Sequence, residues 1–235
     1  MLENYRTMLA KAKRITVLTG AGVSTDSGIP DFRSSDKTWK YDEPREALIS
    51  LPYFLQEPTN FWAVYRGVFG SKFAAEPNSV HRWLASLEKH ADVTIITQNV
   101  DGLHQAAGST NVLEAHGSLR TAECLRCGEK YAMDTLHDQR TPLCEDCNAP
   151  LKPSVSLFME GIHHMGDARD AILESDLFLC VGTSLQVGPV NELPFVAIYA
   201  TEQPTIWLNR EPVPDHYEFS HSILGELSDF VKAIS

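Results

Sequence analysis

Four cysteines stand in two Cys-x-x-Cys pairs, Cys124 with Cys127 and Cys144 with Cys147. Each pair can turn two thiolates toward one ion, and the spacing between the pairs lets two short hairpins complete a tetrahedral zinc site with Zn–S distances of about 2.3 Å. A disulfide framework would need an oxidising compartment, and we recognise no secretory leader. We therefore predict structural zinc. The fifth cysteine, Cys180, lies in an apolar run and is predicted to be buried.

A second chemical signal is the turn formed by Gly20, Ala21 and Gly22 after an apolar run. Two glycines let backbone N–H groups approach a pyrophosphate near a helix start. The usual dinucleotide fingerprint would place a third glycine where this chain has Thr25, so a hydride-transfer dehydrogenase is disfavoured. Taken alone, the turn could also be a structural connection between a strand and a helix.

Length and charge limit the classes of protein that the chain can belong to. Its 235 residues can bury one sizeable core and a satellite module. A net charge of −11 disfavours direct nucleic-acid binding and is compatible with a lysine-rich partner. No apolar run reaches the roughly 18 residues that a membrane-spanning helix needs. We expect a cytoplasmic protein that is a monomer.

Strand-like and helix-like segments alternate along the chain, and the first strand runs directly into the glycine turn. This alternation predicts an α/β fold with a Rossmann-like, doubly wound parallel sheet. The expected strands are residues 14–19, 92–97, 176–182 and 204–208, and the expected helices include residues 2–13, 79–90 and 166–174.

Two segments interrupt this alternation. Residues 34–78 are rich in aromatic side chains, which we expect mainly in a core, and they are predicted to be a helical insertion. Residues 119–150 carry the paired cysteines. We predict that these two insertions form a small domain, and that a ligand binds in the cleft between the domains. The large, nucleotide-binding domain would comprise residues 1–33, 79–118 and 151–235.

The segment from Gly20 to Arg33, GAGVSTDSGIPDFR, resembles the signature of the sirtuin family of NAD-dependent protein deacylases. TQNVDGLH at 97–104, the His116-Gly117 pair, the paired cysteines and GTS at 182–184 follow in the family's order. The resemblance covers nearly the whole chain. It implies NAD and zinc as cofactors, and an acyl-lysine protein or peptide as the partner.

In the reaction implied by this resemblance, the nicotinamide–ribose bond breaks and the acyl group of a lysine passes to ADP-ribose. His116 would be the general base toward a ribose hydroxyl, and Asn99 would hold the nicotinamide ribose. An imidazole suits this task because its ordinary pKa of about 6.5 leaves it largely neutral at neutral pH. The residues implied to bind NAD are Gly20, Ala21, Gly22, Thr25, Asp31, Phe32, Arg33, Gln98, Asn99, Val100, Asp101, Gly182, Thr183, Ser184 and Asn209.

Two of these residues have simpler explanations. Asp101 could cap a helix, and Asn209 could be a turn residue.

Two loops, 156–161 and 185–189, are implied to clamp an extended acyl-lysine segment. The first departs from the family's pattern, because Ser156 replaces the usual valine and Met159 replaces the usual glycine. Val68 stands where sirtuins that prefer acidic acyl groups carry an arginine, so acetyl or longer apolar groups are favoured over succinyl. The predicted substrate-binding residues are Ser156, Phe158, Met159, Glu160 and Val187.

Other functions remain open beside deacetylation. A mono-ADP-ribosyltransferase would use the same activated ribose. A catalytically weak NAD-binding regulatory module would be consistent with the altered loop around Ser156 and Met159. A zinc-ribbon nucleic-acid binder is disfavoured by the acidic balance.

Overall fold

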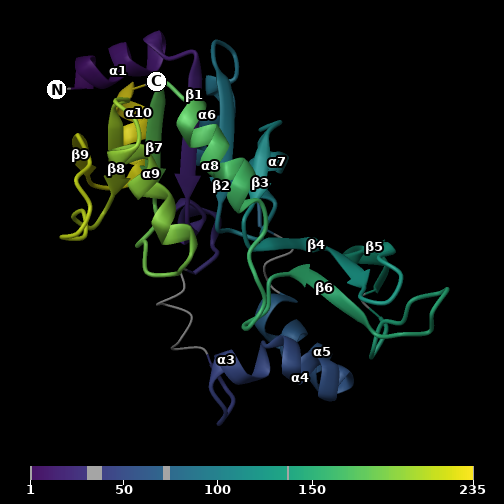
Figure 1. Cartoon of the computed structure of the whole chain (residues 1–235). Coiled ribbons are helices and arrows are strands. Elements are labelled where there is room, and N and C mark those ends of the chain that lie inside the picture. Colours follow the sequence, from purple (N-terminus) through teal and green to yellow (C-terminus); the bar gives the residue numbers. More distant parts are fainter. Residues whose placement is uncertain (1, 31–38, 71–74, 137, 235) are drawn as a thin grey trace.

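The computed structural model describes all residues except 1, 31–38, 71–74, 137 and 235. The described strands form two sheets (Figure 1). The large sheet is parallel with strand order β3-β2-β1-β7-β8-β9, and the small sheet is antiparallel with order β5-β4-β6. The large-sheet strands are β1 (Arg14–Thr19), β2 (Asp92–Thr97), β3 (Val112–Glu114), β7 (Leu177–Val181), β8 (Thr205–Asn209) and β9 (His221–Leu224). The small-sheet strands are β4 (Gly117–Cys124), β5 (Lys130–Ala132) and β6 (Leu151–Val155).

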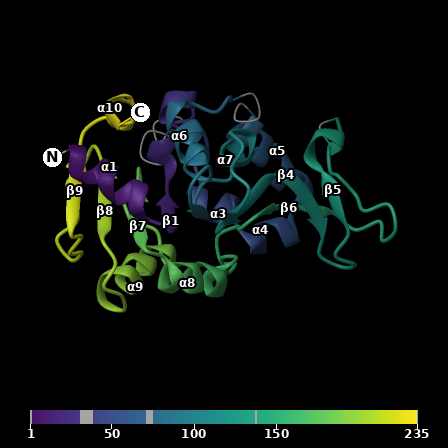
Figure 2. The same ribbon diagram turned by 90° about the horizontal axis from the view of Figure 1, so that it is seen from above.

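Helices cover both faces of the large sheet, so the predicted doubly wound architecture is confirmed (Figure 2). The side chains of β7 alternate between the two cores: Leu179 and Val181 face one, and Phe178 and Cys180 face the other. Cys180 is fully buried, as predicted. The helices of one face are α1 (Leu2–Lys11), α6 (Ser79–Leu87) and α10 (Leu227–Ile234); those of the other are α8 (Met165–Glu174) and α9 (Leu193–Tyr199).

A third core joins the small sheet to three helices, α3 (Arg45–Leu48), α4 (Leu51–Gln56) and α5 (Pro58–Phe69). Phe61, Trp62 and Tyr65 of α5 are each no more than 1% exposed. The Trp62 indole donates a hydrogen bond to the carbonyl oxygen of Leu151 at 2.9 Å. The prediction that these aromatic residues belong to a core is therefore correct.

The position of β6 differs from the predicted domain boundary. The strand pairs antiparallel with β4, with Leu151 opposite Cys124, and so it belongs to the small sheet. From the sequence, residues 151–155 are expected in the large domain instead. β4 leads into the first cysteine pair and β6 follows the second pair. Because the two pairs meet, β6 begins beside β4 and pairs with its edge.

The connection after β1 also differs from the predicted strand, turn and helix. Two 3-10 turns follow, Ala21–Val23 and Thr25–Ser27, in place of an α-helix. The Thr25 hydroxyl donates to the carbonyl oxygen of Gly22 at 3.0 Å. Short polar side chains compete in this way with helical hydrogen bonds, which keeps the segment irregular.

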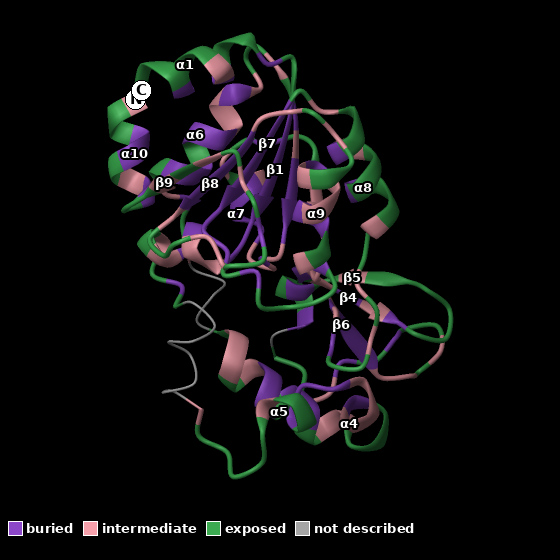
Figure 3. Cartoon of the chain, turned by 60° about the vertical axis from the view of Figure 1, so that its left-hand side comes forward, coloured by how far each residue is buried: buried purple, intermediate pink, exposed green. Residues whose placement is uncertain are grey.

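Burial is concentrated in the strands of the large sheet, while the helices expose their outer faces (Figure 3). The short helix α7 (Leu103–Ala106) follows the loop after β2. None of the helices in the described ranges is both long enough and apolar enough to span a membrane.

Candidate active site

The predicted nucleotide-binding residues gather where the strands of the large sheet end. The parallel neighbours β2, β1, β7 and β8 place their carboxyl ends at one edge. Gly20 follows β1, Gln98 follows β2, Gly182 follows β7, and Asn209 is the last residue of β8. The fold therefore brings together four motifs that are far apart in the sequence.

Gly20 and Gly22 pack directly against the loop after β7. A Cβ atom on Gly20 would lie 2.6 Å from Cβ of Thr183, and one on Gly22 would lie 2.7 Å from the carbonyl oxygen of Gly182. The Gly22 N–H donates to that same oxygen at 2.8 Å. The structural reason for these glycines is thus close packing of two loops, and the Gly22 N–H does not point at a ligand as the sequence suggested.

Thr183 connects two other predicted residues, Gln98 and Asn209. Its hydroxyl accepts from Nε2 of Gln98 at 3.0 Å, and its carbonyl oxygen accepts from Nδ2 of Asn209 at 2.6 Å. Oδ1 of Asn209 accepts from the Arg210 N–H at 2.8 Å. Asn209 therefore stabilises this turn, which agrees with the simpler explanation left open by the sequence. Ser184, the next residue, is exposed.

His116 lies beside Gln98 with its imidazole partly buried. Nδ1 is 2.9 Å from the carbonyl oxygen of Gln98. Because a carbonyl can only accept, Nδ1 carries the proton in the neutral ring, and Nε2 keeps a free electron pair. Burial lowers the pKa of His116; the nearby His163 lowers it further, and the Gln98 hydrogen bond opposes both. The ring is therefore neutral at neutral pH and can accept a proton at Nε2.

Gly117 fixes the backbone on the other side of His116. It has φ +73°, and a Cβ atom there would overlap the carbonyl oxygen of Ser154. Only glycine permits both the conformation and the approach. The carbonyl oxygen of His116 also accepts from the Ser156 N–H at 2.8 Å. The candidate base and the predicted peptide loop are thus joined through the main chain.

Asn99 and Asp101 share a partner that the sequence analysis did not identify, Ser24. Nδ2 of Asn99 donates to the carbonyl oxygen of Gly20 at 3.0 Å and to the Ser24 hydroxyl at 3.1 Å. That hydroxyl donates to Oδ2 of Asp101 at 2.7 Å. Oδ1 of Asp101 accepts from the N–H of Leu103 at the start of α7, so the helix-start role also applies. In the sequence, the position of Ser24 within the GAGVS motif is the one feature that could have indicated its role.

Two buried histidines lie behind this network and were also missed. Nδ1 of His81 accepts from the Asn78 N–H, so the neutral ring carries its proton on Nε2, 3.5 Å from the Ser24 hydroxyl. Nε2 of His104 is 3.0 Å from the Thr19 hydroxyl. Burial lowers the pKa of His81 to about 4 and that of His104 to about 3. Both rings therefore act as neutral hydrogen-bonding groups.

The remaining predicted NAD-binding residues are placed unevenly. Asp31, Phe32 and Arg33 lie outside the described residues. The carbonyl oxygen of Ala21 accepts from the Ser24 N–H within the first 3-10 turn. The carbonyl oxygen of Val100 accepts from the Leu119 N–H at 2.9 Å, which links the site to β4.

The first predicted substrate loop is anchored to the segment before α4. The Phe158 N–H donates to the carbonyl oxygen of Ile49 at 3.0 Å, and the Leu51 N–H donates to that of Phe158 at 3.1 Å. The Ser156 hydroxyl donates to the carbonyl oxygen of Gly161 within the loop. Of the five predicted substrate-binding side chains, those of Phe158, Met159 and Val187 are exposed.

The four paired cysteines converge on one point. Their sulfur atoms all lie within 4.8 Å of one another, and those of Cys127 and Cys144 are 3.6 Å apart. Sulfurs around a tetrahedral zinc at about 2.3 Å would be roughly 3.8 Å apart, so the geometry fits this metal. The Tyr131 hydroxyl donates to Cys144 Sγ and lowers the pKa of that thiol to about 6, toward the thiolate. Four thiolates fill the coordination sphere, which makes the site structural.

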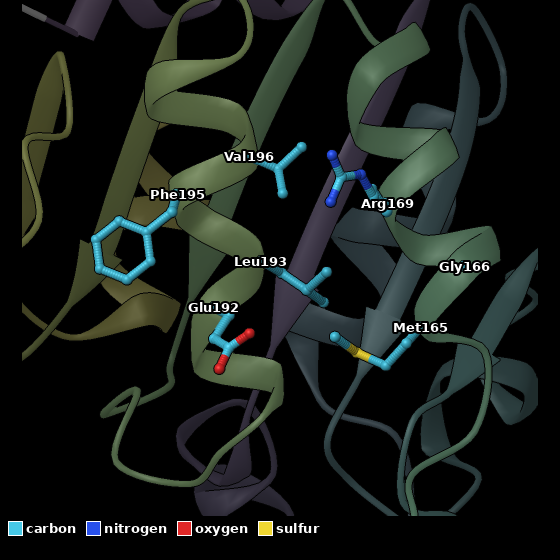
Figure 4. A pocket seen from close by; sticks show the side chains of 7 residues that line it. All are labelled: Met165, Gly166, Arg169, Glu192, Leu193, Phe195 and Val196. Atoms are coloured by element: carbon cyan, nitrogen blue, oxygen red, sulfur yellow. The ribbon is translucent and has the colours of Figure 1, made fainter.

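A surface pocket lies between α8 and α9 (Figure 4). It has a volume of about 680 Å³, and none of the predicted site residues lines it. We therefore do not assign it to the reaction. Its lining residues are Met165, Gly166, Arg169, Glu192, Leu193, Phe195 and Val196.

Residues 20–189 match the model of the Sir2 family. The chain belongs to this family. The resemblance to sirtuins seen in the sequence is thereby confirmed. A relative from Bacillus anthracis, named NAD-dependent protein deacetylase, is 40% identical over 99% of this chain and 97% of its own length.

A relative of the same name from Chromobacterium violaceum is 45% identical over 85% of this chain and 83% of its own length. Among solved structures, one described as "Sir2-p53 peptide-NAD+" is similar with a TM-score of 0.86 and 29% identity, covering 100% of this chain and 97% of that one.

Proposed function

We propose that this chain is an NAD-dependent protein-lysine deacetylase, which releases nicotinamide and transfers the acetyl group of a lysine to ADP-ribose. The names of the full-length relatives support the proposal, as does the similar structure with peptide and NAD. The observation that carries it is the neutral imidazole of His116, with Nδ1–H on the Gln98 carbonyl, at the same sheet edge as the Gly20–Gly22 turn.

In this proposal NAD, when bound, supplies the ribose carbon that becomes electrophilic as nicotinamide leaves. His116 accepts a proton at Nε2 from a ribose hydroxyl, and the Gln98 carbonyl oxygen holds the ring in the required tautomer. Asn99 and Asp101, oriented by the Ser24 hydroxyl, bind the nicotinamide end of the cofactor. Gly20 and Gly22 keep the loop after β7 close, so that Thr183 and Ser184 can lie on the adenosine side.

The acyl-lysine partner would bind as an extended strand beside the loop 156–161. Main-chain groups of this kind give affinity with little dependence on the side chains of the peptide. The exposed Met159 and Val187 would then contact its flanking residues. The proposal includes an acetyl preference over succinyl, because Val68 offers no positive charge to an acidic acyl group.

A direct test is to incubate the protein with an acetyl-lysine peptide and NAD, and to identify the products. We expect nicotinamide, free lysine peptide and O-acetyl-ADP-ribose in equal amounts. ADP-ribose attached to protein would instead indicate a mono-ADP-ribosyltransferase. NAD binding without turnover of any acyl-peptide would indicate a regulatory module.

The proposal also includes a cytoplasmic location and a monomeric state. Four metal-binding thiolates are suited to a reducing compartment. Cell fractionation and sedimentation analysis test the two points separately.

A further inference from the structure

Lys152, the second residue of β6, is a buried charged residue of the small sheet. Its side chain is only 3% exposed. Nζ donates to the carbonyl oxygens of Pro153 and Val155, at 2.9 and 3.0 Å, and to Oε2 of Glu160 at 3.1 Å. A buried ammonium group is unfavourable unless it is fully paired. All three of its donors are therefore used at the point where β6 ends and the predicted peptide loop begins.

Glu160 closes this loop from the other side. Its Oε2 accepts from the N–H of Leu157 at 2.7 Å as well as from Lys152. The Glu160 N–H in turn donates to the carbonyl oxygen of Leu157 at 2.9 Å, which closes a tight turn over residues 157–160. The carboxylate thus points back into its own loop.

Met159 has a backbone conformation in this turn that is unfavourable for a residue with a side chain. Its φ is +70°, a left-handed value that glycine adopts without a steric penalty and other residues avoid. The side chain is 82% exposed, so little packing offsets the unfavourable backbone. An interaction elsewhere must hold the turn in this shape.

The shape of the turn affects both halves of the proposed reaction. Phe158 holds the loop to the segment before α4 through two main-chain hydrogen bonds with Ile49 and Leu51. The Ser156 N–H holds it to the carbonyl oxygen of His116. A loop that relaxed around Met159 would shift the peptide-binding backbone relative to the base.

We propose that Lys152 and Glu160 form a buried ionic clasp that positions the acyl-peptide loop against the unfavourable backbone of Met159. Both are then positioning residues for the substrate peptide, and the inference rests on the proposed function. The hydrogen-bond partners of Lys152 and Glu160 lie in β6 and in the loop 156–161. A second carboxylate, Glu123 of β4, lies 3.8 Å from Nζ of Lys152 and belongs to the same small sheet, so the clasp lies on the peptide side of the site.

Kinetics of Lys152→Met and Glu160→Gln test the inference. Loss of one member of a buried pair should raise the KM for acetyl-peptide about tenfold, while the Kd for NAD changes less than about twofold. The matched control is Lys130→Met on the exposed edge of the same sheet, which should behave as wild type. Adding Met159→Gly to Lys152→Met should recover most of the lost peptide affinity, because glycine no longer needs the clasp.

An unchanged peptide KM in both clasp variants would overturn the inference. So would an equal loss of NAD and peptide binding, which would mean general destabilisation, or a double variant no better than Lys152→Met alone.

Hydrogen exchange of the free protein measures how well the loop is ordered, without requiring turnover. Amides of residues 155–161 should exchange about tenfold faster in Lys152→Met, and the Met159→Gly addition should restore much of the protection. Equal exchange in wild type and Lys152→Met contradicts the clasp. If wild type fails to deacetylate any peptide, the proposed function fails, yet this measurement still decides whether the clasp exists.

Discussion

The two sides of the candidate active site are stabilised by different interactions. The nucleotide side, at the edge of the large sheet, depends on close glycine contacts at Gly20 and Gly22 and on the neutral rings of His81 and His104. The peptide side depends on the Lys152–Glu160 ion pair and on a cluster of four thiols. The first relies on close packing and neutral groups, and the second relies on an ion pair and on thiols placed to bind a metal.

This difference indicates which perturbations each side should resist. Close packing and hydrogen bonds to neutral rings are disrupted by added side-chain atoms and by protonation of the buried rings. Ionic and metal contacts respond to chelation and to loss of a charged partner. The two sides can therefore be disrupted one at a time.

Metal removal should have the largest effect. Chelation, or Cys144→Ser, should unfold the small sheet and lower deacetylation by more than about 100-fold, because the metal supplies folding free energy there. Hydrogen exchange should rise in β4, β5 and β6 and stay slow in β1 and β7. As a control, Cys180→Ala should retain its zinc. Full activity in protein shown to be zinc-free would contradict the structural role of the metal.

Gly22→Ala should weaken NAD binding without disturbing the small sheet. The added methyl group would lie 2.7 Å from the carbonyl oxygen of Gly182, and such overpacking costs about 1–3 kcal/mol. We expect NAD affinity to fall roughly 10- to 100-fold by calorimetry, with zinc content unchanged. Gly166→Ala, which meets no atom within 4 Å, is the matched control. Equal NAD affinity in Gly22→Ala and wild type would show that this contact does not shape the site.

Acid should weaken the nucleotide side. Burial lowers the pKa of His81 to about 4 and that of His104 to about 3, both below the unfolded value of about 6.5. Above pH 6.5 both states are neutral and stability is complete. As the pH falls, the unfolded state binds protons before the folded state does. The free energy of unfolding should therefore fall by roughly 2 kcal/mol per ring by pH 5.

Urea unfolding at pH 7.5 and pH 5 measures this loss. A His104→Asn variant should show a smaller difference between the two pH values, whereas a variant at the exposed His90 should not. A wild-type stability that does not change over this range would refute the assignment of buried neutral rings.

Much of this molecule could be predicted from local patterns in the sequence. The strands at residues 14–19 and 92–97 have the predicted bounds because short runs rich in Val, Ile and Thr are typical of buried strands. The four cysteines form one cluster because their spacing alone determines how two hairpins can meet. The burial of Phe61, Trp62 and Tyr65 followed from aromatic composition at helical spacing.

What the sequence could not predict depends on contacts between distant segments. Ser24 and His81 are 57 positions apart, and only packing of α6 against the turn brings them together. Lys152 belongs to a residue type that is normally exposed, so nothing local indicated its burial. The left-handed backbone of Met159 follows from the hydrogen bonds around the turn, which a residue pattern does not contain.

The most direct test of the account is a single-turnover measurement with His116→Ala, NAD and acetyl-lysine peptide, compared with wild type. We expect that NAD still binds, that nicotinamide is still released, and that formation of O-acetyl-ADP-ribose falls by about 100-fold or more, because the variant lacks the imidazole that accepts the ribose proton. Wild-type activity should persist below pH 6.5, since burial lowers the pKa of His116. O-acetyl-ADP-ribose formed by His116→Ala at the wild-type rate would contradict the role of His116 as the base.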